Sequence, residues 1–392
     1  MNIADFGEGH PGRLVKIPDG GYAFVPDDLP PAVVLQPDIS LMNLNGHAER
    51  AVGKLNGIGG KLRNPHLVIG PLRRREAIRS CKLEGTYTTA TEIILHEAHS
   101  SDKVKSEDVQ EVLNYIQALQ YGLDRSNTLP VSNRLIRECH KFLLAGVRGQ
   151  NEDPGHFRRT QNFIGPDRRI ENARFVPPPV PDMIQSMDNL ESFLHEPELL
   201  PPLIKLALIH YQFEAIHPFR DGNGRLGRLL IALLLCGWKL LDLPLLYLSG
   251  FLESHGAQYK DLLLAVSQSG LWLDWIKFFL RAVIAQANDG VTRSNMLLSL
   301  EEEYRSKLLA IRSSGTPLML LERLFESPWI SLETARAALQ VTPRAAQTNI
   351  NKLIDADILH EVTGRERNRV YVMHRIVEIT EADFIDNVSA DQ

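Results

Sequence analysis

The chain has 392 residues, 44% of them hydrophobic, which is enough for a sizeable core and predicts two or three domains. Its net charge of −5 excludes a global positive field that would attract nucleic acid or anionic lipid. Three widely spaced cysteines (Cys81, Cys139 and Cys236), an N-terminus without an apolar signal sequence and apolar runs too short for a bilayer predict a cytoplasmic protein.

Apolar residues recur at helical spacing through most of the chain and predict a mainly α protein. The first 100 residues are expected to form an N-terminal extension that contains short extended pieces such as 21–25. Residues 101–290 form a helical core, interrupted by the polar, turn-rich segment 155–181. Helices are expected at 38–55, 73–98 with a break near Gly85, 106–122, 131–145, 183–194, 202–213, 226–240, 259–267 and 272–287.

The polar segment contains two short extended pieces, 161–164 and 174–176, around a turn at Gly165-Pro166-Asp167. Short extended runs on either side of a Gly-Pro turn predict a small β-hairpin. This hairpin is the one β excursion expected within the helical core.

A linker helix is expected at 291–314, with a boundary at Ser313-Ser314-Gly315. Residues 315–380 then predict a winged helix-turn-helix, followed by a tail at 381–392. Its elements are helices at 318–325, 332–339 and 343–356 and strands at 358–362 and 369–372. The segment 315–392 holds 8 Lys and Arg against 12 Asp and Glu, which favours protein docking or homodimer formation over DNA contact.

The most informative run is His217-Pro218-Phe219-Arg220-Asp221-Gly222-Asn223-Gly224-Arg225-Leu226-Gly227-Arg228. Proline disfavours helical backbone at the preceding residue, so the helix before it must end near His217. The glycines permit a tight turn whose backbone N–H groups form an anion nest. A new helix begins at about Gly224, and the positive end of its dipole points at the same place.

The side chains of this run are those that phosphate chemistry requires. Arg225 and Arg228 share one helical face and can bind phosphate oxygens through two N–H groups each. Asp221 is the single carboxylate that a protein usually contributes to a Mg²⁺ site beside phosphates. His217 can accept a proton near neutral pH, and Phe219 is expected to anchor the loop to the core. The run predicts phosphoryl or nucleotidyl transfer.

This run resembles the signature of the Fic family, His-Pro-Phe-x-Asp/Glu-Gly-Asn-Gly-Arg-x-x-Arg, at every defined position. The segments 154–158, 161–165 and 175–178 are similar to the family's flap, and about residues 20 to 290 resemble the longer bacterial members. The resemblance implies an all-helical catalytic core over 101–290. A C-terminal winged helix is also common among those members.

The resemblance implies adenylylation, the transfer of AMP from ATP to a Ser, Thr or Tyr hydroxyl of a target protein or of the enzyme itself. His217 would be the general base, and Asp221 would hold Mg²⁺ or Mn²⁺. Relatives that transfer phosphate carry Lys in place of Gly224, so this chain favours nucleotidyl transfer. The residues expected to bind ATP are Gly222, Asn223, Gly224, Arg225, Arg228 and Tyr259, although a half-buried structural tyrosine explains Tyr259 equally well.

The flap would align the acceptor segment of the target by main-chain pairing, which demands little of the target sequence. Its expected contact residues are Asn162, Phe163, Ile164, Gly165, Phe175 and Val176. An ordinary connecting loop is the alternative reading of this segment.

Ser80, Glu84 and Gly85 match the family's inhibitory pattern, Ser/Thr-x-x-x-Glu-Gly/Asn, on a helix expected at about 73–85. The resemblance implies that Glu84 pairs with Arg228 and holds ATP in a nonproductive pose. Two alternatives stay open. The same residues serve de-AMPylation, with Glu84 positioning water, and a nucleotide-sensing DNA-binding regulator would need neither His217 nor Asp221.

Overall fold

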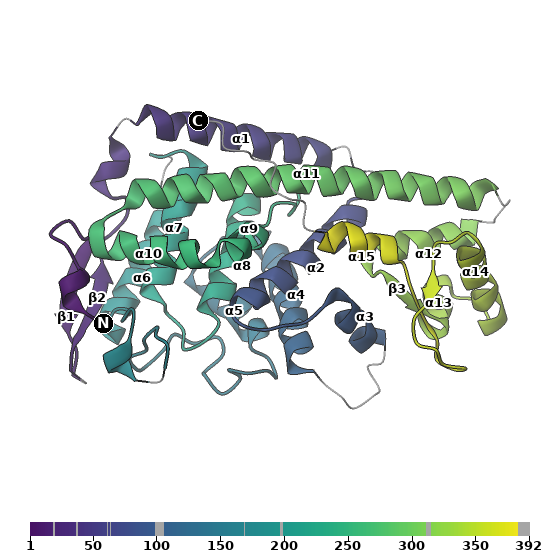
Figure 1. Ribbon diagram of the computed structural model, residues 1–392, viewed down its shortest axis with the longest axis horizontal. Helices are drawn as coiled ribbons and strands as arrows, with labels where there is room; N and C mark the ends of the chain where they lie inside the picture. Colours follow the sequence, from purple (N-terminus) through teal and green to yellow (C-terminus); the bar gives the residue numbers. More distant parts are fainter. Residues whose placement is uncertain are drawn as a thin grey trace.

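The computed structural model describes all residues except 19, 37, 61, 63, 99–105, 168, 197–198, 311–314 and 383–392. It confirms the mainly α prediction, since helices dominate the described residues and the sheets are small (Figure 1). No helix in these residues is long and apolar enough to cross a membrane.

The N-terminal segment forms a two-stranded antiparallel sheet that supports the flap. Strands β1 (Gly12–Lys16) and β2 (Tyr22–Pro26) pair with Leu14 opposite Phe24. The ring of Phe24 is fully buried and lies 5.9 Å from the ring of Phe175. The backbone N–H of Phe24 also donates to the carbonyl of Val176 at 2.9 Å, so β2 fixes the end of the flap segment.

Two long helices lie side by side along one edge of the molecule (Figure 1). Helix α1 (Ile39–Gly59) begins where the Asp38 side chain accepts from the backbone N–H of Leu41, as expected for an N-cap. Its partner α11 runs unbroken from Trp272 to Ala310. The helices expected separately at 272–287 and 291–314 therefore form one continuous helix, while the domain boundary near residue 290 stays a prediction.

Packing explains why α11 continues. Gly290 lies against α1, where a Cβ would stand 3.2 Å from a methyl carbon of Leu55. A glycine inside a helix can thus mark close packing and need not mark a break. Arg293, one turn further on, is fully buried and pairs with Asp289 at 2.8 Å.

The remaining helices enclose one hydrophobic core around α7 (Pro202–Ile216), whose residues are nearly all buried. Helix α8 (Asn223–Gly237) packs against α7, and the loop that carries the motif joins the two helices. The surrounding helices are α2 (His66–Leu83), α3 (Ala90–Ala98), α4 (Glu107–Ser126), α5 (Asn133–Leu143), α6 (Val180–His195), α9 (Ser249–Ser254) and α10 (Gly256–Ser269).

The expected flap hairpin is reduced to a single antiparallel bridge between Ile164 and Phe175. The backbone N–H of Ile164 donates to Phe175 O at 2.8 Å, and Phe175 N donates back at 3.0 Å. No strand forms at 161–164 or 174–176, because the three prolines at 177–179 have no N–H with which to extend the ladder. The Gln161 side chain donates to Pro177 O at 2.8 Å where a further strand bond would lie.

The C-terminal segment contains the three expected helices, α12 (Gly315–Glu326), α13 (Leu332–Leu339) and α14 (Pro343–Asp355). It also contains two unexpected elements, β3 (Trp329–Ser331) and α15 (His374–Glu381). The expected strands are shorter than predicted, β4 (His360–Glu361) and β5 (Val370–Val372), and the sheet order is β3-β5-β4. The winged-helix assignment stays a prediction, while residues 311–314 of the expected linker and most of the tail lie outside the described residues.

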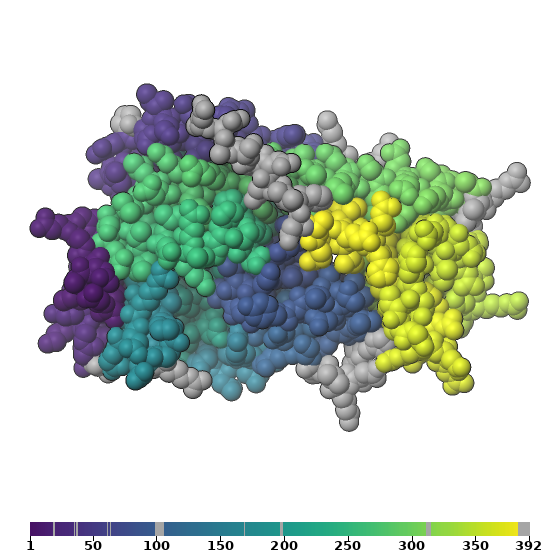
Figure 2. Space-filling view, in the orientation of Figure 1, coloured from purple at the N-terminus to yellow at the C-terminus, as the bar shows by residue number. Residues whose placement is uncertain are grey.

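Helix α2 connects the C-terminal segment to the motif. Near its start, Gly70 lies so close to α12 that a Cβ would stand 3.3 Å from the backbone of Glu326. The helix also packs on α15, and its far end contacts α8. In the space-filling view the yellow C-terminal segment lies directly against the blue segment of α3 and α4 (Figure 2).

Candidate active site

His217 ends helix α7 with a left-handed backbone, φ 50° and ψ 60°. Its N–H still donates to Phe213 O at 3.0 Å, so the residue closes the last helical turn before Pro218 redirects the chain. The ring nitrogen Nδ1 lies 3.3 Å from Glu214 O. Because a carbonyl oxygen only accepts, Nδ1 carries the proton of the neutral ring, and Nε2 keeps the lone pair that a base needs.

Burial lowers the pKa of His217 to about 4, against a smaller opposing effect of the Glu214 carbonyl. The imidazole is therefore neutral at physiological pH. A neutral ring with an available Nε2 lone pair can accept a proton from a hydroxyl group.

The loop after His217 is held by buried contacts. As expected, Phe219 packs in the core, where its ring stacks on His140 with centroids 3.8 Å apart and planes at 17°. The Asn223 side chain accepts from Phe219 N and donates to Phe219 O, both at 2.9 Å. The Asn223 side chain thus shapes the loop, and its expected contact with phosphate stays a prediction.

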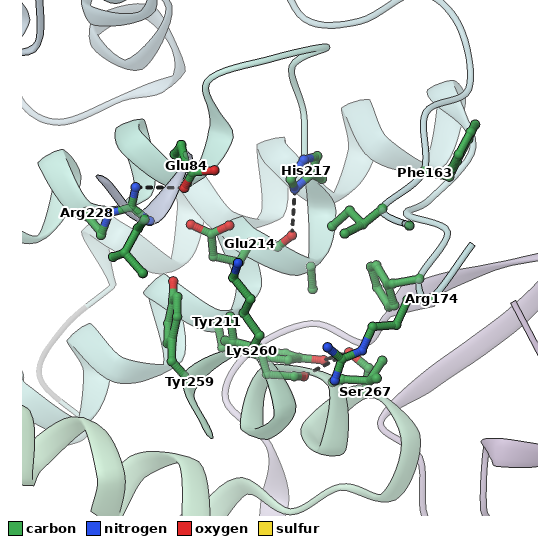
Figure 3. Close-up of a pocket in the computed structure, with 18 residues that line it drawn as sticks. Glu84, Phe163, Arg174, Tyr211, Glu214, His217, Arg228, Tyr259, Lys260 and Ser267 are labelled. Atoms are coloured by element: carbon green, nitrogen blue, oxygen red, sulfur yellow. Dashed lines mark hydrogen bonds and ion pairs between the residues drawn. The ribbon is translucent and has the colours of Figure 1, made fainter. Parts of the chain in front are cut away.

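Gly222 has φ 79°, which permits the turn into α8. Beyond it, Arg228 points from α8 toward Glu84 at the end of α2 (Figure 3). Its Nε donates to Ser80 Oγ at 2.9 Å, and Nη2 donates to Ser80 O at 2.9 Å and to Glu84 Oε1 at 2.8 Å. The expected pairing of Glu84 with Arg228 is present. A Cβ at position 224 would collide with the same Glu84 oxygen, so glycine there permits the approach.

Arg225 lies away from the cavity, although it was expected to bind phosphate. Its side chain is 1% exposed, and Nη1 donates to Glu111 Oε2 at 2.8 Å. Nη2 donates to Asp221 Oδ1 at 3.2 Å. Sequence could not show this partner, because Glu111 is 114 residues away on α4.

We expect Arg225→Met to lower the free energy of unfolding by about 3–5 kcal/mol, because buried Glu111 would lose its closer cation and keep only the exposed Arg148, 3.7 Å away. Urea denaturation measures the change. Arg220→Met is the matched control, since Arg220 is an exposed arginine of the same motif and exposed pairs contribute about 0–1 kcal/mol. The double variant Glu111→Gln/Arg225→Met should recover part of the loss. Equal effects of Arg225→Met and Arg220→Met would contradict a structural role for Arg225.

A cavity of about 430 Å³ lies between α2, α7, α8, α10 and the flap (Figure 3). Nine of the predicted site residues line it: Glu84, Phe163, Ile164, Gly165, Phe175, His217, Gly224, Arg228 and Tyr259. The other predicted residues do not line it: Ser80, Gly85, Asn162, Val176, Asp221, Gly222, Asn223 and Arg225. The Asn162 side chain instead donates to Phe219 O at 3.0 Å, on the motif loop.

Sequence reasoning missed several polar lining residues: Arg174, Tyr211, Glu214, Lys260 and Ser267. The signal for Glu214 was its position three residues before His217, on the same face of α7. Burial raises the pKa of Glu214 to about 7, and its Oε1 has no hydrogen-bond partner within the described part of the chain. Tyr259 is buried and not half-buried, with its hydroxyl 2.8 Å from His210 Nε2.

Asp221 is the candidate metal ligand. Its Oδ1 accepts from Gly222 N and Arg225, and no hydrogen bond from the described residues reaches Oδ2. Those residues contain no cluster of three or more His, Cys, Asp or Glu side chains arranged for a metal. A Mg²⁺ ion shared with phosphates needs no such cluster, so one carboxylate oxygen fits it.

Comparison with solved structures shows the fold class. A Fic family protein from Desulfovibrio desulfuricans G20 aligns with a TM-score of 0.54 and 19% identity, over 86% of this chain and 97% of its own. A Fic domain containing signaling protein from Bacteroides thetaiotaomicron VPI-5482 aligns with a TM-score of 0.52 and 18% identity, over 64% of this chain and 96% of its own. The helical architecture around the cavity is therefore that of Fic proteins.

Sequence comparison identifies two family domains within the chain. Residues 42–124 match the Fic/DOC family N-terminal domain, and residues 130–235 match the Fic/DOC family domain. The chain therefore carries both of these domains.

Curated relatives named Protein adenylyltransferase Fic are 33% identical over 127 residues in Nematostella vectensis and 32% identical over 202 residues in Drosophila willistoni. These alignments cover 31% and 48% of this chain. They span only 27% and 38% of the length of the relatives.

Proposed function

We propose that this protein transfers AMP from ATP to a hydroxyl group of a target protein and of itself. One observation carries the proposal: a neutral imidazole with an available Nε2 faces the same cavity as the Arg228 guanidinium and Gly224 at the start of α8. That arrangement pairs a base with positive charge at a helix N-terminus. The relatives named as protein adenylyltransferases support the same activity.

In the proposed reaction the acceptor oxygen attacks the α-phosphorus of ATP, and His217 Nε2 takes the hydroxyl proton. The bond from the α-phosphorus to the bridging oxygen breaks, and pyrophosphate leaves. The backbone N–H of Gly224, at the start of α8, stabilises the phosphate charge, together with Arg228 once it is released from Glu84. Mg²⁺ or Mn²⁺, held by Asp221, would supply further charge neutralisation when bound.

The flap is proposed to present the target. Phe163, Ile164 and Gly165 line the cavity, and only one backbone bridge pairs this segment with Phe175. Unpaired main-chain groups in such a segment can bond to an extended peptide, which brings a hydroxyl near His217 without demanding a particular sequence.

Glu84 is proposed to act as a built-in inhibitor. Its carboxylate and both Ser80 oxygens together engage Arg228 through three hydrogen bonds. These bonds occupy Nε and Nη2 of Arg228, so the guanidinium cannot turn both groups toward a γ-phosphate, and ATP would bind in a nonproductive pose.

The C-terminal segment is proposed to form a winged helix-turn-helix that docks a protein or forms a homodimer, since its charge balance disfavours DNA. Arg344 and Lys352 are the two basic residues of α14, and the segment 315–392 as a whole has no positive excess. Gel shifts with duplex DNA at several salt concentrations are expected to show no salt-dependent complex. A cytoplasmic location is proposed from the three free cysteines, which fit a reducing compartment.

Mass spectrometry of the purified protein after incubation with ATP and Mg²⁺ tests the activity. We expect a covalent gain of one AMP per modified hydroxyl, slow in the wild type and faster in Glu84→Gly. A gain of phosphate alone, or no gain in either protein, would contradict AMP transfer. Loss of AMP from a previously modified protein would indicate de-AMPylation as the main activity.

A further inference from the structure

Arg158 is a buried arginine outside the motif. It is 2% exposed, and within the described residues no carboxylate forms an ion pair with it. Burial lowers the pKa of Arg158 to about 10, so the guanidinium stays charged at neutral pH. A buried cation without an acidic partner is unfavourable unless its N–H groups are satisfied by hydrogen bonds.

The guanidinium is satisfied by three backbone carbonyls from three places in the chain. Nε donates to His217 O at 3.1 Å, Nη1 donates to Thr160 O at 3.3 Å, and Nη2 donates to Pro178 O. The backbone N–H of Arg158 also donates to Pro218 O at 2.9 Å. Arg158 therefore donates hydrogen bonds to the carbonyl groups of both His217 and Pro218.

Thr160 and Pro178 stand at the two ends of the flap. The prolines at 177–179 prevent strand pairing there, so the planar guanidinium joins the two ends where a hairpin ladder would otherwise do so. The third carbonyl belongs to His217, whose left-handed backbone is unfavourable for a residue with a side chain. Hydrogen bonds to its carbonyl stabilise that conformation.

We propose that Arg158 is a positioning residue that fixes the left-handed backbone of His217 and ties it to both ends of the flap. The imidazole and the target-binding segment then keep one relative geometry. Arg158 does not line the cavity, so it acts through His217 and the flap and not by touching ATP.

The charge of Arg158 also acts on the imidazole. After burial, which is the largest effect, Arg158 lowers the pKa of His217, whereas the Glu214 carbonyl, Glu84 and Asp221 raise it. Removing the guanidinium charge should therefore raise the pKa of His217 toward its ordinary value. A purely structural arginine elsewhere in the protein would not produce this change.

The kinetic test rests on the proposed AMP transfer and uses the 392-residue Glu84→Gly protein. Arg158→Lys keeps the charge, but its donors all leave from one nitrogen and lack the planar fork that reaches three separate carbonyls. We expect transfer to fall about 10²-fold with the KM for ATP unchanged. Arg158→Gln removes the charge as well. Arg159→Gln is the matched control, because Arg159 is the exposed neighbour on the same segment. Equal transfer rates in Arg158→Lys and Arg159→Gln would overturn the proposal.

A second measurement does not depend on activity. NMR titration of the histidine rings, with His217 assigned through His217→Gln, should show a raised pKa of His217 in Arg158→Gln and no change in Arg159→Gln. An unchanged pKa of His217 in a folded Arg158→Gln protein would also overturn the proposal. Thermal unfolding checks that each variant is folded, and Arg158→Lys carries the test if Arg158→Gln does not fold. If Glu84→Gly itself transfers no AMP, the proposed function fails while the titration still decides the role of Arg158.

Discussion

His217→Ala is expected to abolish AMP transfer while ATP binding is retained. The imidazole is the group in the cavity whose Nε2 can accept the hydroxyl proton, and loss of a general base typically slows a reaction by about 10²–10⁴-fold. ATP binding should persist, because the phosphate contacts assigned to Gly224 and Arg228 do not involve the imidazole. Transfer of labelled AMP and isothermal titration with ATP, both in the Glu84→Gly background, measure the two effects separately.

His195→Ala is the control for this experiment, since His195 is an exposed histidine at the end of α6. Its transfer rate should match that of the parent protein. A His217→Ala variant that kept the full rate would remove His217 as the base. A variant that lost ATP binding as well would instead point to collapse of the loop after Pro218.

The pH dependence of transfer should follow the lowered pKa of His217. Burial holds the folded pKa near 4, so the ring stays neutral as the pH falls from 8 through 6.5. Only near pH 4 does protonation remove the base, so kcat/KM should show no acid limb centred near 6.5. The pH profile of kcat/KM is measured with a target peptide that does not itself titrate in this range, so that it reports on the free enzyme. An acid limb with its midpoint near 6.5 would contradict a neutral imidazole with a lowered pKa.

The sequence predicted those features that depend on neighbours along the chain. Pro218 correctly placed the end of α7 at His217, and the spacing of Ser80 and Glu84 correctly put both on one side of α2. The end of that helix before Gly85 was also predictable from the local sequence, because Gly85 has a left-handed φ of 84° that glycine adopts readily. These features follow from backbone sterics and helical periodicity.

Contacts between distant segments could not be predicted in the same way. The spacing in the motif suggested that Arg225 and Arg228 act together. Glu111 on α4 instead accepts a hydrogen bond from Arg225, and of the two arginines it is Arg228 that lines the cavity. Arg158 likewise donates to three backbone carbonyls in different parts of the chain, and no sequence pattern predicts that these carbonyls lie together. The local sequence shows which reactions or hydrogen bonds a polar side chain is capable of. The tertiary fold determines which group it contacts.

Glu84→Gly is expected to raise self-modification and target modification by about 5–150-fold, the range of a typical coupling between two sites. The substitution removes the carboxylate that accepts from Arg228 Nη2 at 2.8 Å. Helix α2 should tolerate glycine there, because Glu84 is its C-cap and lies outside the regular helix. Initial rates with labelled ATP and a target protein provide the measurement.

Two controls separate the Arg228 contact from general loosening of α2. Glu253→Gln weakens the ion pairs of Arg79 and Lys82, on the same helix, without touching Arg228 and should leave the rate unchanged. Ser80→Ala removes one of three hydrogen bonds to Arg228 and should give a smaller increase than Glu84→Gly. Activation of Glu253→Gln to the level of Glu84→Gly would show that α2 inhibits by its position and not through this carboxylate.

The inhibitory contact should also persist across the neutral pH range. Burial raises the pKa of Glu84, but Arg228 outweighs burial and holds that pKa below its ordinary value. A lowered folded pKa means that the contact is fully present above the unfolded value of about 4.5 and is lost only as the pH falls through the folded pKa. The ratio of Glu84→Gly to wild-type rates should therefore stay constant between pH 6 and 8. A ratio that fell toward one within this range would show that another titrating group, and not the carboxylate of Glu84, controls access to Arg228.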